Sequence, residues 1–239
     1  MKITNEVVAI LKNFATINPS IYITKGNSLS TISDIANNIR ARAEIEESFT
    51  HDFGIYDLSR FLNVMSLYDE PTITCHESYL DIGGSDKNKT TTYFYANKEY
   101  IKKYEGKVKK LPDPIASINI TKDVLQEIQK SSNILQVPDL VIKSDGEKVL
   151  VKIFNKDVET SNVHMIDMDI DPKGVKYNFF IKIDLIEKMI PIDYQMDIIG
   201  ERDDSGSMIM MGCFKNSNQD TFKNLEYLVA VEFDSTFEE

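Results

Sequence analysis

The chain has 239 residues, of which 27 are basic and 38 acidic, so its formal net charge is −11. With 42% hydrophobic and 27% charged residues it has the apolar surface to fold, which excludes a disordered chain. No apolar run is long enough to span a membrane, and the N-terminus lacks the apolar core of a signal peptide. Two cysteines cannot supply a disulfide framework, so a reducing compartment is expected. The net charge also argues against a protein that coats nucleic acid with its whole surface.

The first half of the chain predicts two helices among short strands. Apolar residues recur at the helical period over 2–17, and Pro19 follows the end of this helix. Asp57 can cap a second helix of about ten residues. Because Gly26 lies between two β-like runs, 20–24 and 28–32, we expect these runs to form a hairpin. Further strands are predicted over 41–49, 72–76, 79–82 and 90–96.

The order of helix, strands, short helix and strands then repeats. Thr121 can cap a third helix that ends near residue 135, and a fourth is predicted over 184–190. Asp145-Gly146 is typical of a hairpin turn. Strands are expected over 140–143, 148–154, 162–170, 175–183, 193–199, 207–214 and 225–233.

A lysine-rich stretch, 98–110, separates the two halves and is followed by Pro112 and Pro114. Its composition makes it the best candidate for a linker. We therefore predict an α+β protein with two similar domains, residues 1–112 and 113–239, each with two helices packed on antiparallel sheets.

Residues with the spacing of a metal site are absent from the sequence. The histidines are His51, His76 and His164, and no CxxC or HxxxH motif occurs. The run Asp167-Met168-Asp169-Ile170-Asp171 resembles the start of a calcium loop, but Pro172 and Asn178 replace the expected glycine and glutamate. We favour a strand with three aspartates on one solvated face. No nucleophile elbow or phosphate-binding glycine motif is present, so no catalytic, metal or cofactor site is predicted.

The predicted helices are electrically balanced. Basic and acidic residues are equal in number across the four helical segments, so the remaining chain carries the whole net charge. The outward mid-helix positions Lys12, Arg60 and Lys130 are basic. Ordinary amphipathic helices with solvated lysines produce the same pattern.

Several segments resemble the T-even-type bacteriophage sliding clamp family. The octapeptide LKNFATIN at 11–18 resembles the first helix of that family, and IYDL at 55–58 resembles the second. Shorter matches occur at 61–62, 66–67, 154–156, 229–232 and 234–236. Residues 75–110 and 200–222 show no clear match.

The resemblance implies the DNA-clamp fold, in which three subunits close a ring with helices lining the hole. It implies a protein without enzymatic activity or cofactor that encircles duplex DNA. An ATP-driven clamp loader would place the ring on DNA, and the ring would tether the replicative polymerase in the cytoplasm of the infected bacterial host. Related phage clamps also act with late-transcription factors.

Simple geometry is compatible with this ring. Four helices from each of three subunits, spaced about 10 Å apart, make a circumference of about 120 Å. The hole is then about 28 Å wide, enough for a duplex about 20 Å across. The basic residues expected to face DNA are Lys2, Lys12, Arg60, Lys122, Lys130 and Lys188.

Two further surfaces follow from the resemblance. Ile115, Val231 and Phe233 are candidates for a groove that receives peptide tails of partners, although core packing explains them as well. Tyr93-Phe94-Tyr95 fits either an edge strand that pairs with the next subunit or the interior of a hairpin.

Two other functions stay open. An acidic DNA mimic that inhibits a DNA-processing enzyme would need carboxylates clustered like phosphates, whereas these acids are dispersed among bases. A hydrolase that uses a divalent ion with Asp167 and Asp169 has no specific support in the sequence.

Overall fold

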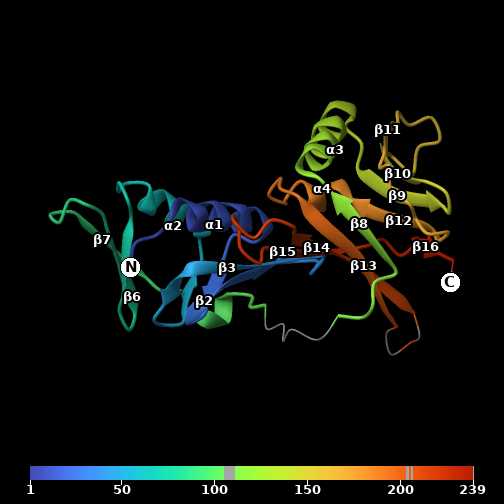
Figure 1. The fold of residues 1–239 in the computed structure, drawn as a ribbon. Coiled ribbons are helices and arrows are strands. Elements are labelled where there is room, and N and C mark those ends of the chain that lie inside the picture. Colours follow the sequence, from blue (N-terminus) through green and yellow to red (C-terminus); the bar gives the residue numbers. More distant parts are fainter. Residues whose placement is uncertain (105–110, 203–204, 206, 239) are drawn as a thin grey trace. The chain divides into compact units, whose positions relative to one another are not determined.

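The computed structural model describes residues 1–104, 111–202, 205 and 207–238 (Figure 1). The chain forms two compact units. The first comprises Met1–Lys107 and Asn218–Glu226, and the second comprises Val108–Ser217 and Tyr227–Glu239. Each unit carries two helices and antiparallel strands, which confirms the predicted α+β class. The boundary at residue 112 stays a prediction, and most of the lysine-rich stretch, 105–110, lies outside the described residues.

In the first unit, the sequence sets the helix boundaries through capping side chains. Helix α1 spans Asn5–Ile17, where the Thr4 hydroxyl accepts a hydrogen bond from the Val7 N–H. Helix α2 spans Leu58–Met65, where the Asp57 carboxylate accepts from the Arg60 N–H at 2.8 Å. The prediction that the first helix includes residue 2 is wrong, because the N-cap is Thr4 and Lys2 instead pairs with Thr72 in a β-bridge.

The strands of the first unit form small antiparallel sheets. The predicted hairpin around Gly26 is wrong: the strand before it pairs with residues 53–55, and the strand after it pairs with residues 39–49. Helix α1 packs against β2 and β3, and α2 packs against β6. The strands are β1 (Ile21–Ile23), β2 (Gly26–Ile32), β3 (Ile39–Phe49), β4 (Phe53–Ile55), β5 (Thr72–Cys75), β6 (Tyr79–Gly83) and β7 (Thr90–Phe94), and a short 3₁₀ helix spans Lys98–Tyr100.

The second unit repeats this plan with longer sheets. One sheet has the order β11-β10-β9-β12-β16, and β8, β13, β14 and β15 are neighbours in another. Helix α3 (Lys122–Leu135) packs against β10, and α4 (Ile183–Ile186) packs against β12 (Figure 1). The strands are β8 (Ala116–Ile120), β9 (Asp139–Asp145), β10 (Val149–Phe154), β11 (His164–Asp167), β12 (Lys176–Lys182), β13 (Tyr194–Arg202), β14 (Met208–Asn216), β15 (Glu226–Ala230) and β16 (Thr236–Phe237).

Three details of the second unit correct the sequence prediction. The fourth helix is a single turn that ends at Ile186, so Lys188 lies beyond it. Strands β8 and β16 were not predicted, because five and two residues give little periodicity. The aspartate run does not form one strand, since β11 ends at Asp167 and Asp169 has a φ of 48°.

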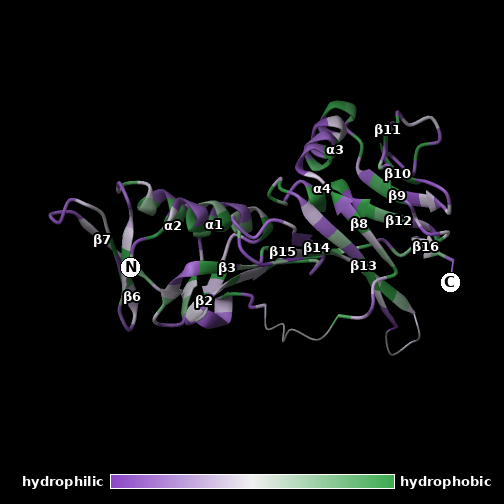
Figure 2. Cartoon of the chain, viewed as in Figure 1, coloured by the Kyte–Doolittle hydropathy of each residue, from purple (hydrophilic) through white to green (hydrophobic). Residues whose placement is uncertain are grey.

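Apolar side chains meet between the helices and the sheets in both units. In the first unit Phe14 and Phe61 are fully buried, and the Phe61 ring packs edge-on against Tyr93 at 5.3 Å. In the second, the buried rings of Tyr194 and Tyr227 lie 6.0 Å apart. Hydrophobic and hydrophilic residues alternate along the strands, which leaves one face for the helices (Figure 2). None of the helices in the described ranges is long and apolar enough to cross a bilayer.

A buried amide fixes the end of α1 to the sheet. Asn18 is only 1% exposed, and its Nδ2 donates to the Ile32 carbonyl at 2.9 Å. Its Oδ1 accepts from the backbone N–H of Ser20 at 2.8 Å. Asn18 is the last residue of the octapeptide that resembles the clamp family, so that motif has a structural role here.

We predict that Asn18→Ala lowers the free energy of unfolding by about 2 kcal/mol, because two buried backbone groups lose their partners. Urea titration followed by circular dichroism measures the change. Thr16→Ala, on the exposed face of the same helix, is the matched control and should change stability by less than about 0.5 kcal/mol. Equal effects of the two substitutions would contradict the structural role of Asn18.

Candidate nucleic-acid interface

The two helices of the first unit each expose one basic side chain. Lys12 lies on α1 opposite the buried stripe that contains Leu11 and Phe14. Arg60 lies in the first turn of α2, where 76% of its side chain is exposed and its Nε is 3.5 Å from Asp57 Oδ2. Both residues therefore lie where the sequence predicts them, on outward helix positions.

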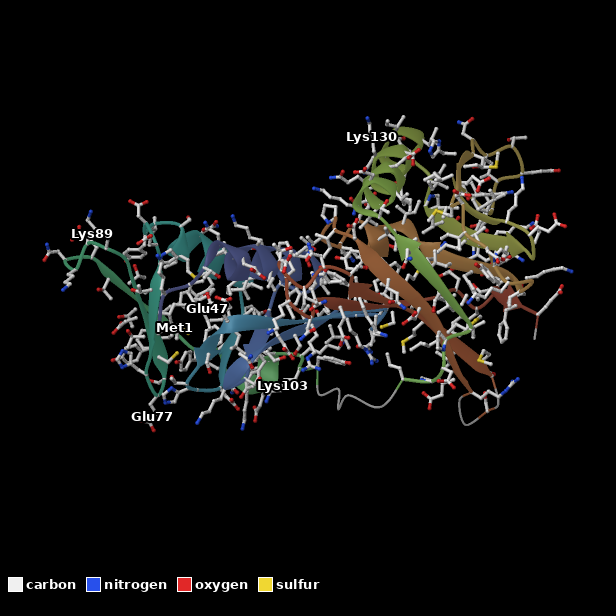
Figure 3. All side chains as sticks on the ribbon, in the orientation of Figure 1. Met1, Glu47, Glu77, Lys89, Lys103 and Lys130 are labelled. Atoms are coloured by element: carbon white, nitrogen blue, oxygen red, sulfur yellow. The ribbon has the colours of Figure 1, made fainter. Side chains whose placement is uncertain are left out.

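The basic residues of the second unit are less uniform. Lys130 is exposed in the middle of α3 and extends from that helix (Figure 3). Lys122 is the first residue of α3, and its backbone N–H donates to Asp193 Oδ1 at 2.6 Å. Lys188 is half-buried and follows α4.

Lys2 differs from the other basic candidates. It precedes α1, and its Nζ donates to Glu70 Oε1 at 2.8 Å. This hydrogen bond from Lys2 lowers the pKa of the Glu70 carboxyl, so the charge of Lys2 already has a partner. Its placement off the helix weakens its case as a DNA-facing residue.

The helices of the described chain carry four basic and four acidic residues, so the helical surface has no net charge. Some of these acids have partners within their own unit. The carboxylate of Glu6 accepts from the backbone N–H of Phe222 at 2.6 Å, and that of Glu127 lies 2.8 Å from His164 Nε2. A surface with balanced charges binds phosphate weakly and without sequence preference.

The three candidate groove residues lie in different environments. Val231 is 8% exposed, and its N–H donates to the Met210 carbonyl. Ile115 is half-buried against Gly200, where a Cβ would lie 3.0 Å from its Cδ1. Phe233 is 92% exposed. Core packing therefore accounts for Val231, whereas Phe233 is available to a partner.

An ion-pair cluster holds the segment that carries Phe233. Lys156 Nζ lies 2.8 Å from Asp234 Oδ2 and 3.2 Å from Glu232 Oε2, and the Glu232 N–H donates to the Phe180 carbonyl. The hydrogen bond to Asp234 raises the pKa of Lys156, burial opposes the shift, and Glu232 supports it. This cluster joins two of the family-like segments, 154–156 and 232–236, which the sequence alone did not connect.

Strand β7 divides the aromatic triplet between the two predicted environments. Tyr93 points toward α2 and its hydroxyl donates to the Asp57 carbonyl, whereas Phe94 is 71% exposed. Tyr95 follows the strand, and its hydroxyl donates to the His76 carbonyl. Strand β7 ends the order β5-β6-β7, so it is an edge strand of its sheet.

Within the described residues, no group of three or more His, Cys, Asp and Glu side chains has a metal-binding arrangement. His76 and His164 each contact one carboxylate, Asp81 at 2.9 Å and Glu127 at 2.8 Å. Asp167 Oδ1 accepts from the N–H of Asp169, so this carboxylate stabilises a turn.

The sequence is similar to a known family and to phage proteins. A family model described as DNA polymerase processivity factor matches residues 4–106. The sliding clamp of Vibrio phage KVP40 is 27% identical over 203 residues, which cover 83% of this chain and 90% of that protein. The sliding clamp of Enterobacteria phage T4 is 28% identical over 243 residues, 99% of both chains.

Solved structures show the same fold. A PCNA from A. fulgidus, bound to the C-terminal region of FEN-1, superposes with a TM-score of 0.65 at 13% identity, covering 96% of both chains. The beta clamp of Helicobacter pylori, bound to a DNA ligase peptide, gives a TM-score of 0.58 at 13% identity. The match covers 98% of this chain but 66% of the bacterial clamp, so the chain spans about two thirds of that protein.

We predict that the stability contributed by Lys156 is lost at alkaline pH. Because the pKa of this lysine is raised, the contribution is fully present below the ordinary lysine pKa of about 10.4 and disappears as the pH rises through the raised value. At pH 8, Lys156→Gln should lower the thermal midpoint by about 2–4 °C.

The difference in midpoint between wild type and Lys156→Gln should shrink above about pH 10.4. Lys152→Gln, on the same strand and without an ion pair in the described residues, is the control and should show no such dependence. A wild-type advantage that persists unchanged to pH 11.5 would count against the ion-pair cluster.

Proposed function

We propose that this chain, which belongs to the sliding clamps of T4-type phages, encircles duplex DNA and tethers the replicative DNA polymerase. The similarity to the T4 phage sliding clamp over 99% of both chains carries this conclusion, and the clamp fold supports it. Members of this family are processivity factors, so the chain acts by tethering rather than by catalysis. The acidic DNA mimic is set aside, because the relatives are clamps along the full length.

The charge distribution suits retention by enclosure. A ring stays on DNA because it is closed, so strong phosphate contacts are unnecessary and would slow sliding. The helices carry equal numbers of acidic and basic residues, which supports weak contact with any sequence. The excess of acid on the remaining surface repels DNA that is not threaded through the hole.

The residues proposed to face DNA form two groups. Lys12, Arg60 and Lys130 have the strongest support, because each is exposed on a helix. Lys122 and Lys188 follow at the ends of α3 and α4. Lys2 has the weakest support, because it pairs with Glu70.

The assembly and its loading are also proposals. Three copies, each with two domains divided near residue 112, would close the ring around DNA. An ATP-driven clamp loader would open the ring in the cytoplasm of the infected host, and late-transcription factors would use it as well. A gain in apparent stability with protein concentration is expected of such an assembly.

Partners are proposed to bind through short peptide tails. The solved relatives hold the C-terminal region of FEN-1 and a DNA ligase peptide, which shows that other proteins of this fold receive such segments. Here the polymerase tail would contact the surface near Ile115 and Phe233, with Val231 packed beneath it.

We predict that the protein, once loaded, remains on circular DNA and leaves linear DNA through its ends. Gel filtration of labelled clamp, loaded on nicked circular DNA and then treated with a single-cutting nuclease, measures retention before and after cutting. Blocking the linear ends with a bound protein should restore retention. Equal loss from circular and linear DNA would overturn the topological mechanism.

We predict that the triple variant Lys12→Gln, Arg60→Gln, Lys130→Gln shortens the products of single-encounter primer extension by several-fold. Removing three positive charges weakens the contact with phosphates, and the exposed positions leave folding intact. The matched control is Lys25→Gln, Lys143→Gln, Lys223→Gln, which removes the same charge from exposed positions outside the helices. Equal loss of extension in both variants would place the DNA contact elsewhere.

A further inference from the structure

The two units each end in an exposed strand that lacks a second neighbour in the described structure. Strand β7 ends the sheet β5-β6-β7, whose opposite edge is covered where Lys2 bridges Thr72. Strand β11 ends the sheet β11-β10-β9-β12-β16. Such edges present unpaired backbone donors and acceptors, which makes them sites for strand addition.

Strand β7 places its side chains on two distinct faces. Thr91 and Tyr93 face the helix side: Tyr93 packs on Phe61, and the Thr91 hydroxyl is 2.7 Å from that of Tyr68. Successive strand residues point to opposite faces, so Thr92 and Phe94 lie on the face away from the helices. Phe94 therefore exposes an aromatic ring at the edge of that outer face.

Strand β11 has the same division. His164 contacts Glu127 of α3, which places His164 and Ile166 on the helix side. Met165 and Asp167 lie on the outer face, and Met165 is 60% exposed. Val163, directly before the strand, is 48% exposed. This edge therefore offers an apolar surface at its N-terminal end.

The charges at the two edges are opposite in sign. Lys87 and Lys89 precede β7 in the hairpin from β6, and Lys89 extends from its tip (Figure 3). Lys89 has one contact, 3.3 Å from Asp86, with 74% of its side chain exposed. At the other edge, Asp167, Asp169 and Asp171 follow at the C-terminal end of β11, and none has an ion pair among the described residues.

We propose that β7 of one copy adds in antiparallel fashion to β11 of a second copy, with Phe94 against Val163 and Met165 and with Lys87 and Lys89 facing the aspartates. The proposal rests on the proposed function, since it names the contact by which copies of the chain associate. It also gives the aspartate run, which neither binds metal nor forms one strand, a role as counter-charge.

The antiparallel direction follows from the order of residues along each edge. In an antiparallel pair the lysine end of β7 meets the aspartate end of β11, and Phe94 meets Val163 and Met165. A parallel pair would instead place Phe94 beside Asp167 and leave the lysines beside Val163. With the helices of both copies on one side of the joined sheet, both apolar groups lie on the same outer face.

The contact uses different surfaces on the two copies. Such a head-to-tail interface can repeat around a ring until the last copy meets the first. It therefore leaves no edge of this kind unpaired once the ring closes.

The test is a charge exchange, with subunit association measured by sedimentation over a range of concentrations. Lys87→Glu with Lys89→Glu should raise the apparent dissociation constant at least about tenfold at 50 mM salt, as should Asp167→Lys with Asp171→Lys. All four substitutions in one chain should restore association to within about threefold of wild type. Higher salt should weaken wild-type association.

The matched control is Lys25→Glu with Lys223→Glu, which changes the net charge of the first unit equally and should leave association unchanged. Circular dichroism verifies that each variant folds. An absence of effect from the lysine pair, or no recovery in the four-substitution variant, would overturn the proposed interface. If wild type nevertheless forms a trimer retained on circular DNA, the sliding clamp function stands without it.

Cysteine cross-linking tests the direction of the strands. In a Cys75→Ser background, Phe94→Cys with Val163→Cys should form disulfide-linked dimers and trimers on oxidation. Phe94→Cys with Asp167→Cys should not, because four residues of strand separate the two positions by about 13 Å. Cross-linking only in the second pair would show the parallel direction and overturn the proposal.

Discussion

Burial of one face of each long helix against one face of an antiparallel sheet is the constraint on which the rest of this structure depends. Helix α1 buries Val7, Leu11 and Phe14 together with the alternate residues of β3. A helix has only one apolar stripe, so the opposite positions must be polar. Those positions are where Lys12 and Arg60 lie, and a sliding surface for DNA is thus a by-product of how the domains pack.

The sequence predicts elements whose signals are local, and it fails where pairing is decided at a distance. Caps at Asp57 and Thr121 and the turn at Asp145-Gly146 were predicted because each involves residues a few positions apart. The turn at Gly26 misled, since β1 pairs with β4 some thirty residues further along the chain. Burial by the helices, which no local pattern reports, favours that pairing.

The candidate site shows the same division. The exposure of Lys12 and Lys130 follows from helical period, so the sequence places them correctly. The engagement of Lys2 with Glu70 and of Lys156 with Asp234 depends on contacts across 68 and 78 residues, which the sequence did not predict. Matched segments at both ends of the Lys156 cluster were the available signal, although their proximity is visible only in the folded chain.

The first unit is discontinuous in sequence, since it recruits Asn218–Glu226 from the far end of the chain. In that segment the Phe222 N–H donates to Glu6, and the Lys223 carbonyl accepts from the Glu44 N–H. During synthesis, α1 emerges from the ribosome long before these partners exist. At about 5–20 residues per second, the N-terminal unit waits on the order of ten seconds or more for its last segment. The two halves therefore mature together, and a half-length translation product lacks part of its own first domain.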